Sequence, residues 1–291
     1  MPELPELQAL ATDLGARLKG GVIERLQIMA FAALKTFEPS VTALGGAVIR
    51  GVSRQGKFLD IAAQPPDGHE LHLVMHLARA GWIRWRDAPP PPATGLGKGP
   101  LAARLVLEGG SGLDVTEAGT KKSLAIYLVT DPMSVPGIAR LGPDPLDAAF
   151  TEQAFAQILR DAGRSQIKGV LRNQSLIAGI GNAYSDEILH TAKMSPFKPA
   201  AMTADEVHRL FEAIGTTLRD ALARADGLAA SELKKEKKSG MRVHGRTGEA
   251  CPVCGDTVRQ VRFADSTLQY CPTCQTGGRP LADRVLSRLL K

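Results

Sequence analysis

Four cysteines constrain this chain more than any other feature of its sequence. They are Cys251, Cys254, Cys271 and Cys274, and no other cysteine occurs among the 291 residues. Two Cys-x2-Cys pairs separated by 16 residues place two pairs of thiolates on two tight turns, which is the arrangement of a tetrahedral zinc site. Four unrelated buried thiols are the alternative, but Cys-Pro-x-Cys occurs twice. The spacing predicts one structural Zn2+ bound by all four cysteines.

The segment between the two cysteine pairs has the pattern of a β-hairpin. Residues 258–263 and 267–270 are rich in strand-forming side chains and flank a turn at 264–266. We therefore predict a β-hairpin zinc finger over residues 243–276. Such a hairpin either contacts nucleic acid or only holds a terminus in place, and the spacing does not separate these alternatives. The leucines of the tail, 277–291, have helical spacing and predict a short amphipathic helix.

The first half of the chain has the pattern of a helix followed by an antiparallel sandwich. Apolar residues at helical spacing predict a helix over 4–18, with a proline in its first turn. From about 20 to 130, short runs of Val, Ile and Leu alternate with Gly and Pro, as in a β-sandwich. Residues 88–100 are too rich in Pro and Gly for an element interior and predict a flexible loop. This predicts a first domain over 1–133.

Helical periodicity dominates the second half of the chain. Four prolines lie within residues 131–147 and mark a boundary, of which 134–147 is the predicted linker. Helices are then predicted over 151–162, 166–173, 183–192 and 203–225, within a helical domain that spans 148–242. The predicted fold class is therefore α+β and multi-domain: a β-sandwich flanked by a helix, a helical domain and a β-hairpin zinc finger.

A glycine-containing turn separates two of the predicted helices. Gly179 and Gly181 lie in this turn, and Asn182 opens the helix that follows. Backbone amides at a helix N-terminus favour a phosphate group. The alternative is an ordinary Asn N-cap after a flexible turn.

Charge and composition restrict the classes of partner. Hydrophobic residues make up 44% of the chain and charged residues 23%, an ordinary globular composition that argues against general disorder. The 36 Lys and Arg exceed the 30 Asp and Glu, a modest excess that suits a polyanion. The N-terminal segment lacks the pattern of a signal peptide, and no apolar stretch approaches the length of a membrane span. These features predict a cytoplasmic protein without a membrane partner.

Three separated motifs now coincide. They are Met-Pro-Glu-Leu-Pro-Glu at 1–6, Ile-Ala-Gly-Ile-Gly-Asn-Ala-Tyr-Ser-Asp-Glu-Ile-Leu at 177–189, and Gly-Arg-Thr-Gly-Glu-Ala-Cys-Pro-Val-Cys-Gly at 245–255. In this order they resemble the formamidopyrimidine-DNA glycosylase and endonuclease VIII family over nearly the whole chain. The resemblance implies a β-sandwich, a helix-two-turns-helix domain and a zinc finger, with DNA held between the domains.

The resemblance also implies an activity and a partner. The activity is that of a bifunctional DNA glycosylase and AP lyase of base-excision repair, which removes oxidised or ring-opened bases. The partner is double-stranded DNA that contains damaged bases or abasic sites. We expect the protein to be a monomer. We also expect a bacterial-type localisation, in the cytoplasm and associated with the nucleoid through DNA.

The implied catalytic residues are Pro2, Glu3 and Lys57. After removal of Met1, the secondary amine of Pro2 is the nucleophile that forms a Schiff base with the sugar. Glu3 is the acid/base partner, and Lys57 is a catalytic lysine on the phosphate side. By themselves, Pro2 and Glu3 are typical of a helix start, and Lys57 of a solvated strand end.

Further residues are implied to contact DNA. Asn182 is the expected phosphate ligand, and Met75 aligns with the family's methionine that fills the gap left by a flipped nucleotide. His72 is a weaker candidate for the same surface. The alternatives are core packing for Met75 and a satisfied core histidine for His72.

The chain departs from the family pattern at two recognition positions. Residues 116–123 stand where relatives carry an Arg and an aromatic wedge, and here only Lys121 or Lys122 offers a cation. Ser266 stands where relatives carry the zinc-finger Arg that grips phosphate; Arg262 is near in sequence. We therefore expect DNA contacts from Lys121, Lys122 and Arg262, and the preferred opposite base is left open.

A basic segment over 226–242 replaces the usual lid and is predicted to be mostly helical. Its lysines 234, 235, 237 and 238 are either a solvated face or a contact to the DNA backbone beside Arg242 and Arg246. These departures leave alternative functions open. Besides the bifunctional enzyme, the alternatives are a glycosylase for bulky or crosslinked lesions, a bare AP lyase, and a damaged-DNA-binding protein of the same fold with weak or no catalysis.

Overall fold

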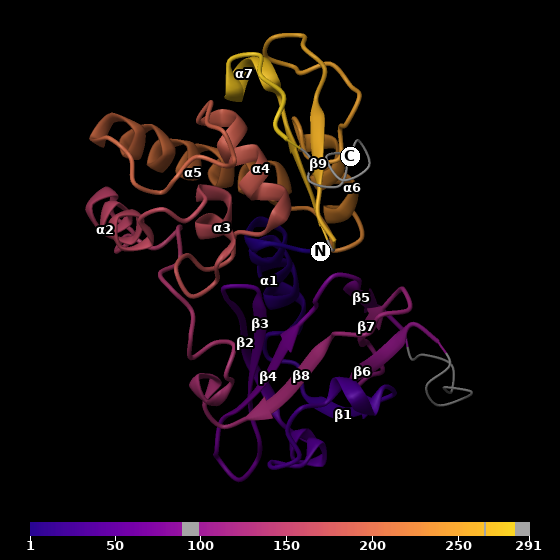
Figure 1. Ribbon diagram of the computed structural model, residues 1–291. Helices are drawn as coiled ribbons and strands as arrows, with labels where there is room; N and C mark the ends of the chain where they lie inside the picture. The colour runs from indigo at the N-terminus through magenta and orange to yellow at the C-terminus, as the bar shows by residue number, and fades with distance from the viewer. Residues whose placement is uncertain (89–98, 265, 283–291) are drawn as a thin grey trace. The chain divides into compact units, whose positions relative to one another are not determined.

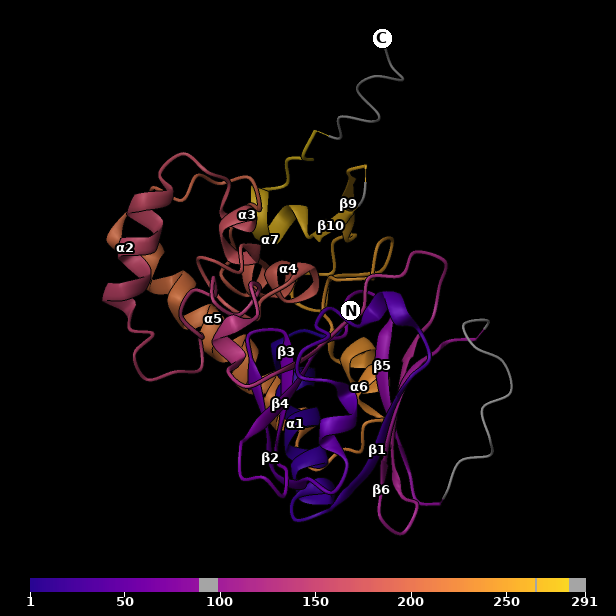
Figure 2. The ribbon, with the colours of Figure 1, turned by 90° about the horizontal axis from the view of Figure 1, so that it is seen from below.

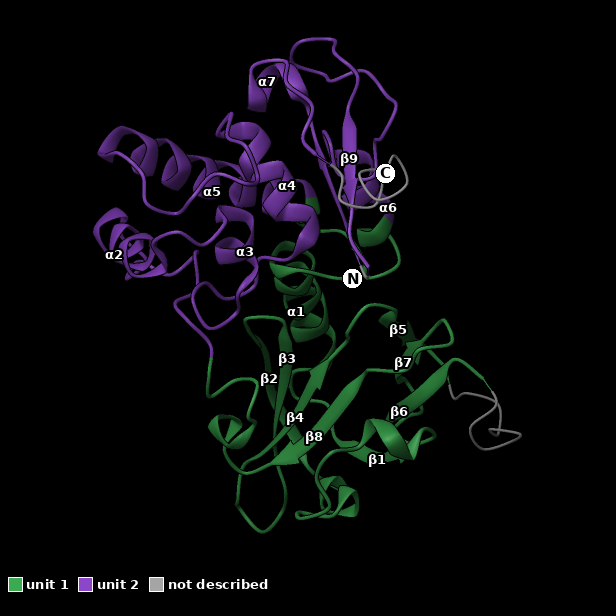
Figure 3. Ribbon diagram, viewed as in Figure 1, with its two compact units in different colours: residues 1–140, 225–234 green, residues 141–224, 235–291 purple. Residues whose placement is uncertain are grey.

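The structure is a computed structural model that describes residues 1–88, 99–264 and 266–282 (Figure 1). The loop predicted at 88–100 and the tail helix predicted at 277–291 therefore lie mostly outside the described residues. The chain forms two compact units (Figure 3). The first comprises Met1–Arg140 and Ala225–Lys234, and the second comprises Leu141–Arg224 and Lys235–Lys291.

Helix α1, Leu4–Leu18, opens the first unit with the predicted bounds. Its start is stabilised by Glu6, whose Oε2 accepts a hydrogen bond of 2.8 Å from the backbone N–H of Glu3. This acceptor satisfies an amide that has no partner within the helix. The leucines at helical spacing are fully buried in the core of the unit, as the sequence predicts.

Two four-stranded antiparallel sheets follow α1 and confirm the predicted sandwich. One has the order β2-β3-β4-β8 and the other β1-β6-β7-β5. The strands of the first sheet are β2 (Val48–Gln55), β3 (Phe58–Gln64), β4 (Leu71–His76) and β8 (Ala125–Val129). Those of the second are β1 (Ile23–Ile28), β5 (Gly81–Arg86), β6 (Leu101–Leu107) and β7 (Gly112–Glu117). Short 3-10 helices are η1 (Phe31–Ala33), η2 (Val41–Leu44) and η3 (Pro132–Ser134).

Strand β4 shows which of its side chains face the core. Leu71, Leu73 and Met75 alternate into the core cluster, as the two-residue period of a strand requires. Met75 is only 1% exposed. This burial favours the packing alternative for Met75, and insertion of Met75 into the gap in the DNA stays a prediction.

The second unit is helical, as predicted. Its helices include α2 (Glu152–Ala162), α3 (Ile167–Arg172), α4 (Asn182–Thr191) and α5 (Ala204–Ala225). Gln174 holds the turn between α3 and α4, because its side chain accepts from Gly179 N at 2.9 Å and donates to Ile180 O at 2.7 Å. Gly179 has a φ of +85°, a conformation that glycine adopts without strain.

The C-terminal part of the chain adds a helix and the hairpin module. Helix α6, Leu233–Gly240, makes the basic segment helical only in its second part, so the prediction of a mostly helical segment over 226–242 holds for 8 of its 17 residues. Strands β9 (Arg259–Arg262) and β10 (Thr267–Tyr270) form the predicted hairpin, and α7 (Pro272–Thr276) follows. Among the described residues, no helix is both long and apolar enough to span a membrane.

Candidate active site and metal centre

The N-terminus and the β2–β3 turn meet at one end of the first unit. Pro2 and Glu3 are buried at the start of α1, and Lys57 in the turn is 7% exposed. Arg54 links the two segments, because its Nε donates to Gln8 Oε1 at 3.2 Å and its Nη1 to the Gly56 carbonyl at 2.9 Å. The structure therefore brings the three predicted catalytic residues to the same end of α1 and of the sheet.

His76 extends this site and was missed by the sequence analysis. It ends β4 directly opposite Phe58 of β3, and the two rings lie 4.8 Å apart. Burial, together with the nearby Lys57 ammonium, lowers the pKa of His76 from 6.5 to about 4. The imidazole is therefore neutral at pH 7. The sequence signal for His76 was its position at the end of a predicted strand, on the face of the sheet opposite to that of Met75.

The loop with Lys121 and Lys122 opens at the same edge of the sheet. Strand β8 begins at Ala125, which pairs with His76. The buried Glu117 carboxylate accepts the backbone N–H groups of Ser123 and Leu124 at 2.7 and 3.0 Å. Lys122 donates to the Glu117 carbonyl, while Lys121 is exposed. The two lysines thus flank the edge that carries Lys57.

His72 has a structural environment. Its Nδ1 lies 3.0 Å from both carboxylate oxygens of Asp60, and its Nε2 lies 3.2 Å from Glu70. Burial raises the pKa of Asp60, and this effect exceeds the opposing effect of His72. Both ring nitrogens therefore face carboxylates, which favours the alternative of a satisfied histidine over a DNA contact.

Asn182 lies beside the zinc-finger hairpin in the second unit. Its Nδ2 donates to the Thr267 carbonyl at 2.8 Å. An amide group has two N–H donors, so one remains available for a phosphate oxygen. Arg262 is exposed and lies directly opposite Thr267 in the hairpin. The structure thus brings two of the predicted DNA contacts, Asn182 and Arg262, to the same residue of β10.

A buried polar network beneath Asn182 was also missed by the sequence analysis. Lys168 is 5% exposed, and its Nζ donates to the Asn182 carbonyl, Ser185 Oγ and Asp186 Oδ1 at 3.1, 2.6 and 2.7 Å. The second carboxylate oxygen of Asp186 lies 2.7 Å from His244 Nδ1. This network fixes the backbone at the start of α4 to α3 and to the segment before the finger.

Glu187 closes the same region. Its carboxylate accepts the backbone N–H groups of Arg242, Val243 and His244 at 2.8, 3.0 and 2.8 Å. Burial raises the pKa of Glu187, opposed by these hydrogen bonds. The signal for these residues was that two adjacent acidic residues precede the apolar pair Ile188 and Leu189 within one predicted helix, α4.

Arg246 ties α6 to the finger. Its guanidinium donates to the carbonyls of Met241 and Ser239 at 3.0 and 3.2 Å and pairs with Glu249 at 2.9 Å. These contacts give Arg246 a structural role within the second unit. A contact from Arg246 to DNA stays a prediction.

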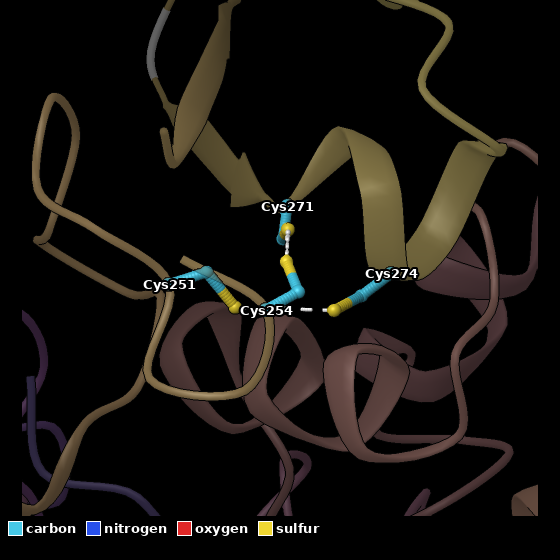
Figure 4. A group of neighbouring side chains, drawn as sticks. All are labelled: Cys251, Cys254, Cys271 and Cys274. Carbon is cyan, nitrogen blue, oxygen red and sulfur yellow. Dashed lines mark hydrogen bonds between the residues drawn. The ribbon is translucent and has the colours of Figure 1, made fainter. Parts of the chain in front are cut away.

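The four cysteines form the predicted metal centre (Figure 4). Their sulfur atoms all lie within 4.8 Å of one another, with Cys251 3.9 Å from Cys274 and Cys254 3.3 Å from Cys271. Zn–S bonds of about 2.3 Å in a tetrahedron require sulfur separations of about 3.8 Å. The geometry fits one zinc ion with four thiolates and no open position, so the zinc is structural.

Three family models match the chain in order. The N-terminal domain of formamidopyrimidine-DNA glycosylase matches residues 1–121, its H2TH domain matches 141–232, and the zinc finger found in FPG and IleRS matches 248–277. Formamidopyrimidine-DNA glycosylases of Symbiobacterium thermophilum and Thermus thermophilus are each 34% identical to the chain. The alignments cover 94% and 96% of the chain, and 89% and 100% of the relatives.

Solved structures give the same result. The formamidopyrimidine-DNA glycosylase of Lactococcus lactis bound to DNA with an AP site is 27% identical, with a TM-score of 0.79 over 94% of this chain and 99% of that one. The MutM (FPG) structure from Thermus thermophilus is 30% identical, with a TM-score of 0.78 over 96% and 100%.

The sandwich, the glycine turn before α4 and the four-cysteine hairpin together define a zinc-finger DNA glycosylase of base-excision repair. More particularly, the chain belongs to the formamidopyrimidine-DNA glycosylase family, whose members have both glycosylase and AP lyase activity. This finding confirms the resemblance noted from the sequence.

Proposed function

We propose that the chain excises oxidised or ring-opened bases from double-stranded DNA and cleaves the strand with its N-terminal proline. The observation that carries this proposal is the meeting of Pro2, Glu3 and Lys57 at one end of the first unit. The neutral His76 and the neighbouring Lys121 complete a surface suited to a DNA strand.

The chemistry follows from a secondary amine beside a buried carboxylate. Once Met1 is removed, the Pro2 nitrogen attacks the sugar C1′, and the damaged base leaves with a proton. Glu3 protonates the ring oxygen as the sugar opens, which gives an iminium ion on Pro2. Loss of a C2′ proton then expels the 3′ phosphate by β-elimination, and δ-elimination expels the 5′ phosphate. Water finally hydrolyses the iminium and releases Pro2.

Lysine and amide donors position the DNA backbone. In this proposal, Lys57 and Lys121 bind phosphates at the edge of the first unit, and Asn182 binds a phosphate at the start of α4. Arg262 supplies the cation that Ser266 does not provide, because both flank Thr267 on the hairpin. A charge-assisted hydrogen bond of this kind contributes about 1.5–3 kcal/mol.

The turn between β4 and β5 offers an exposed residue for the DNA contact that the sequence analysis gave to the buried Met75. Arg79 is exposed there, directly after Ala78, which has a φ of +50°. The turn follows His76, so Arg79 extends from the catalytic edge of the sheet. We assign to Arg79 the contact with the DNA stack that the sequence analysis gave to Met75.

The proposed domain boundaries remain those of the sequence analysis. They are a catalytic sandwich over 1–133, a linker over 134–147, a helix-two-turns-helix domain over 148–242, the finger over 243–276 and a tail over 277–291. The family-model matches at 1–121, 141–232 and 248–277 are compatible with this division. In this proposal the protein acts as a cytoplasmic monomer that associates with the nucleoid through DNA.

Two observations favour a second candidate, a glycosylase for bulky or crosslinked lesions or a binding protein with weak catalysis. Ser266 replaces the phosphate-gripping Arg, and residues 116–123 contain no aromatic wedge.

Borohydride trapping on an abasic-site duplex separates these functions. We expect the wild type to form a covalent adduct, and Pro2→Gly and Glu3→Gln to lose it. If the wild type forms no adduct on any abasic or lesion duplex, the proposed enzyme activity is wrong.

A further inference from the structure

The first unit contains a pocket far from the catalytic end. It has a volume of about 570 Å3 and lies between β5, the later turns of α1 and residues 229–234. Figure 2 shows β5 beside the start of α6. Its walls include Trp82 and Trp85, the only two tryptophans of the chain. Arg17 in this pocket follows Glu3 by 14 residues on α1, so at 1.5 Å per residue the two lie about 20 Å apart.

The two indole rings are fixed, and each carries a cation. Trp82 Nε1 donates to the Ala230 carbonyl at 3.0 Å, and Trp85 Nε1 donates to Asp87 at 2.6 Å. The Lys234 ammonium lies 4.6 Å above the Trp82 ring, and the Arg17 guanidinium lies 5.5 Å above the Trp85 ring. Cations over aromatic faces beside an open pocket are typical of surfaces that bind single-stranded nucleic acid.

Two cations that line the pocket, Lys234 and Arg84, lie near each other without an acidic partner among the described residues. Neither Lys234 nor Arg84 forms an ion pair in the part of the chain that the structure describes. Burial and then the nearby Arg84 lower the pKa of Lys234. Of the acids in the wall, Asp13 pairs with Arg17 through Oδ1 while its Oδ2 has no hydrogen-bond partner among the described residues, and Asp87 accepts a hydrogen bond from Trp85. Two like charges held together are unfavourable until an anion lies between them.

We propose that this pocket binds one nucleotide of an unpaired DNA strand, with its phosphate between Lys234 and Arg84 and its base against Trp85 and Arg17. A free nucleotide offers the same phosphate and base, so the test below separates the two sources. The site goes beyond the proposed function, because none of its residues belongs to the catalytic edge. The proposed site also gives Lys234, the first lysine of the basic segment, a DNA contact within the first unit.

The two tryptophans make the test specific. Their fluorescence is recorded on the full-length, zinc-loaded protein during titration with a tetramer of thymidylate or with thymidine monophosphate. We expect saturable quenching by the tetramer, weakened at least tenfold by Lys234→Met and by Arg84→Gln. Lys235→Met is the matched control, because it removes the same charge from the next position of α6 and is expected to bind like the wild type. Unchanged melting curves show that each variant is folded.

The outcomes separate the sources and the proposals. Tighter binding of the tetramer assigns the site to a DNA strand, and equal affinity for the monophosphate assigns it to the free nucleotide. Absence of quenching by both ligands overturns the pocket, as does an equal loss in Lys235→Met, since binding then depends on net charge alone. Borohydride trapping by the same preparation reports the catalytic function independently, so failure of one proposal leaves the other to be judged on its own assay.

Discussion

Replacement of Lys168 by Met tests whether the buried network supports the DNA-binding end of α4. Lys168 donates three hydrogen bonds of 2.6–3.1 Å, one of them to the carboxylate of Asp186, whose side chain is 1% exposed. Methionine keeps the apolar stem and removes the charge. Asp186 then retains His244 as a partner but loses its closest cation.

The expected effect is large for a single substitution. Removing one partner of a buried ion pair destabilises a protein by about 3–5 kcal/mol, because the remaining charge stays buried. Total stabilities are of the order of 5–15 kcal/mol, so Lys168→Met removes a substantial part of the stability of the second unit. The Asn182 carbonyl also loses a donor, so binding to every DNA duplex weakens together.

Urea unfolding compares this variant with Lys198→Met. Lys198 forms an ion pair of 2.9 Å with Glu206, but the two side chains are 29% and 26% exposed. Partly exposed pairs contribute about 0–1 kcal/mol, so we expect Lys198→Met to unfold close to the wild type. Equal losses in the two variants, or a loss below about 1 kcal/mol for Lys168→Met, contradict the structural role of the network.

Three further predictions concern the catalytic edge, the hairpin and the metal. We expect an NMR titration to give the His76 ring a pKa of about 4. Because this pKa is below its unfolded value of 6.5, His76 lowers the stability of the fold as the pH falls from about 6.5 to about 4. Lys57→Met raises the pKa of His76, and an unchanged pKa contradicts the proximity of the two residues. Arg262→Gln weakens binding of an abasic duplex about tenfold or more, whereas Arg259→Gln, at the far end of β9, leaves it nearly unchanged. Removal of zinc by a chelator unfolds the finger and abolishes binding to all duplexes, and retained binding rejects a structural zinc.

The elements that the sequence predicted well carry their signal locally. The leucine spacing of α1 determines one buried face, so both ends of that helix could be predicted. The four thiols likewise occur in two short motifs. In each case a few neighbouring residues contain the whole physical constraint.

The residues that were missed depend on long-range pairing. Lys168 and Asp186 are 18 residues apart, and Glu187 binds backbone groups 55–57 residues away. No local pattern contains such contacts. Met75 is a different case, since its alternation with Leu73 along β4 by itself indicates a core position.

The most direct test of the account is mass spectrometry of the adduct trapped by borohydride on abasic DNA. The account predicts a protein that lacks Met1, with the sugar fragment attached to the nitrogen of Pro2 in the N-terminal peptide. An adduct on Lys57, or an active enzyme that retains Met1, contradicts the assignment of Pro2 as the nucleophile.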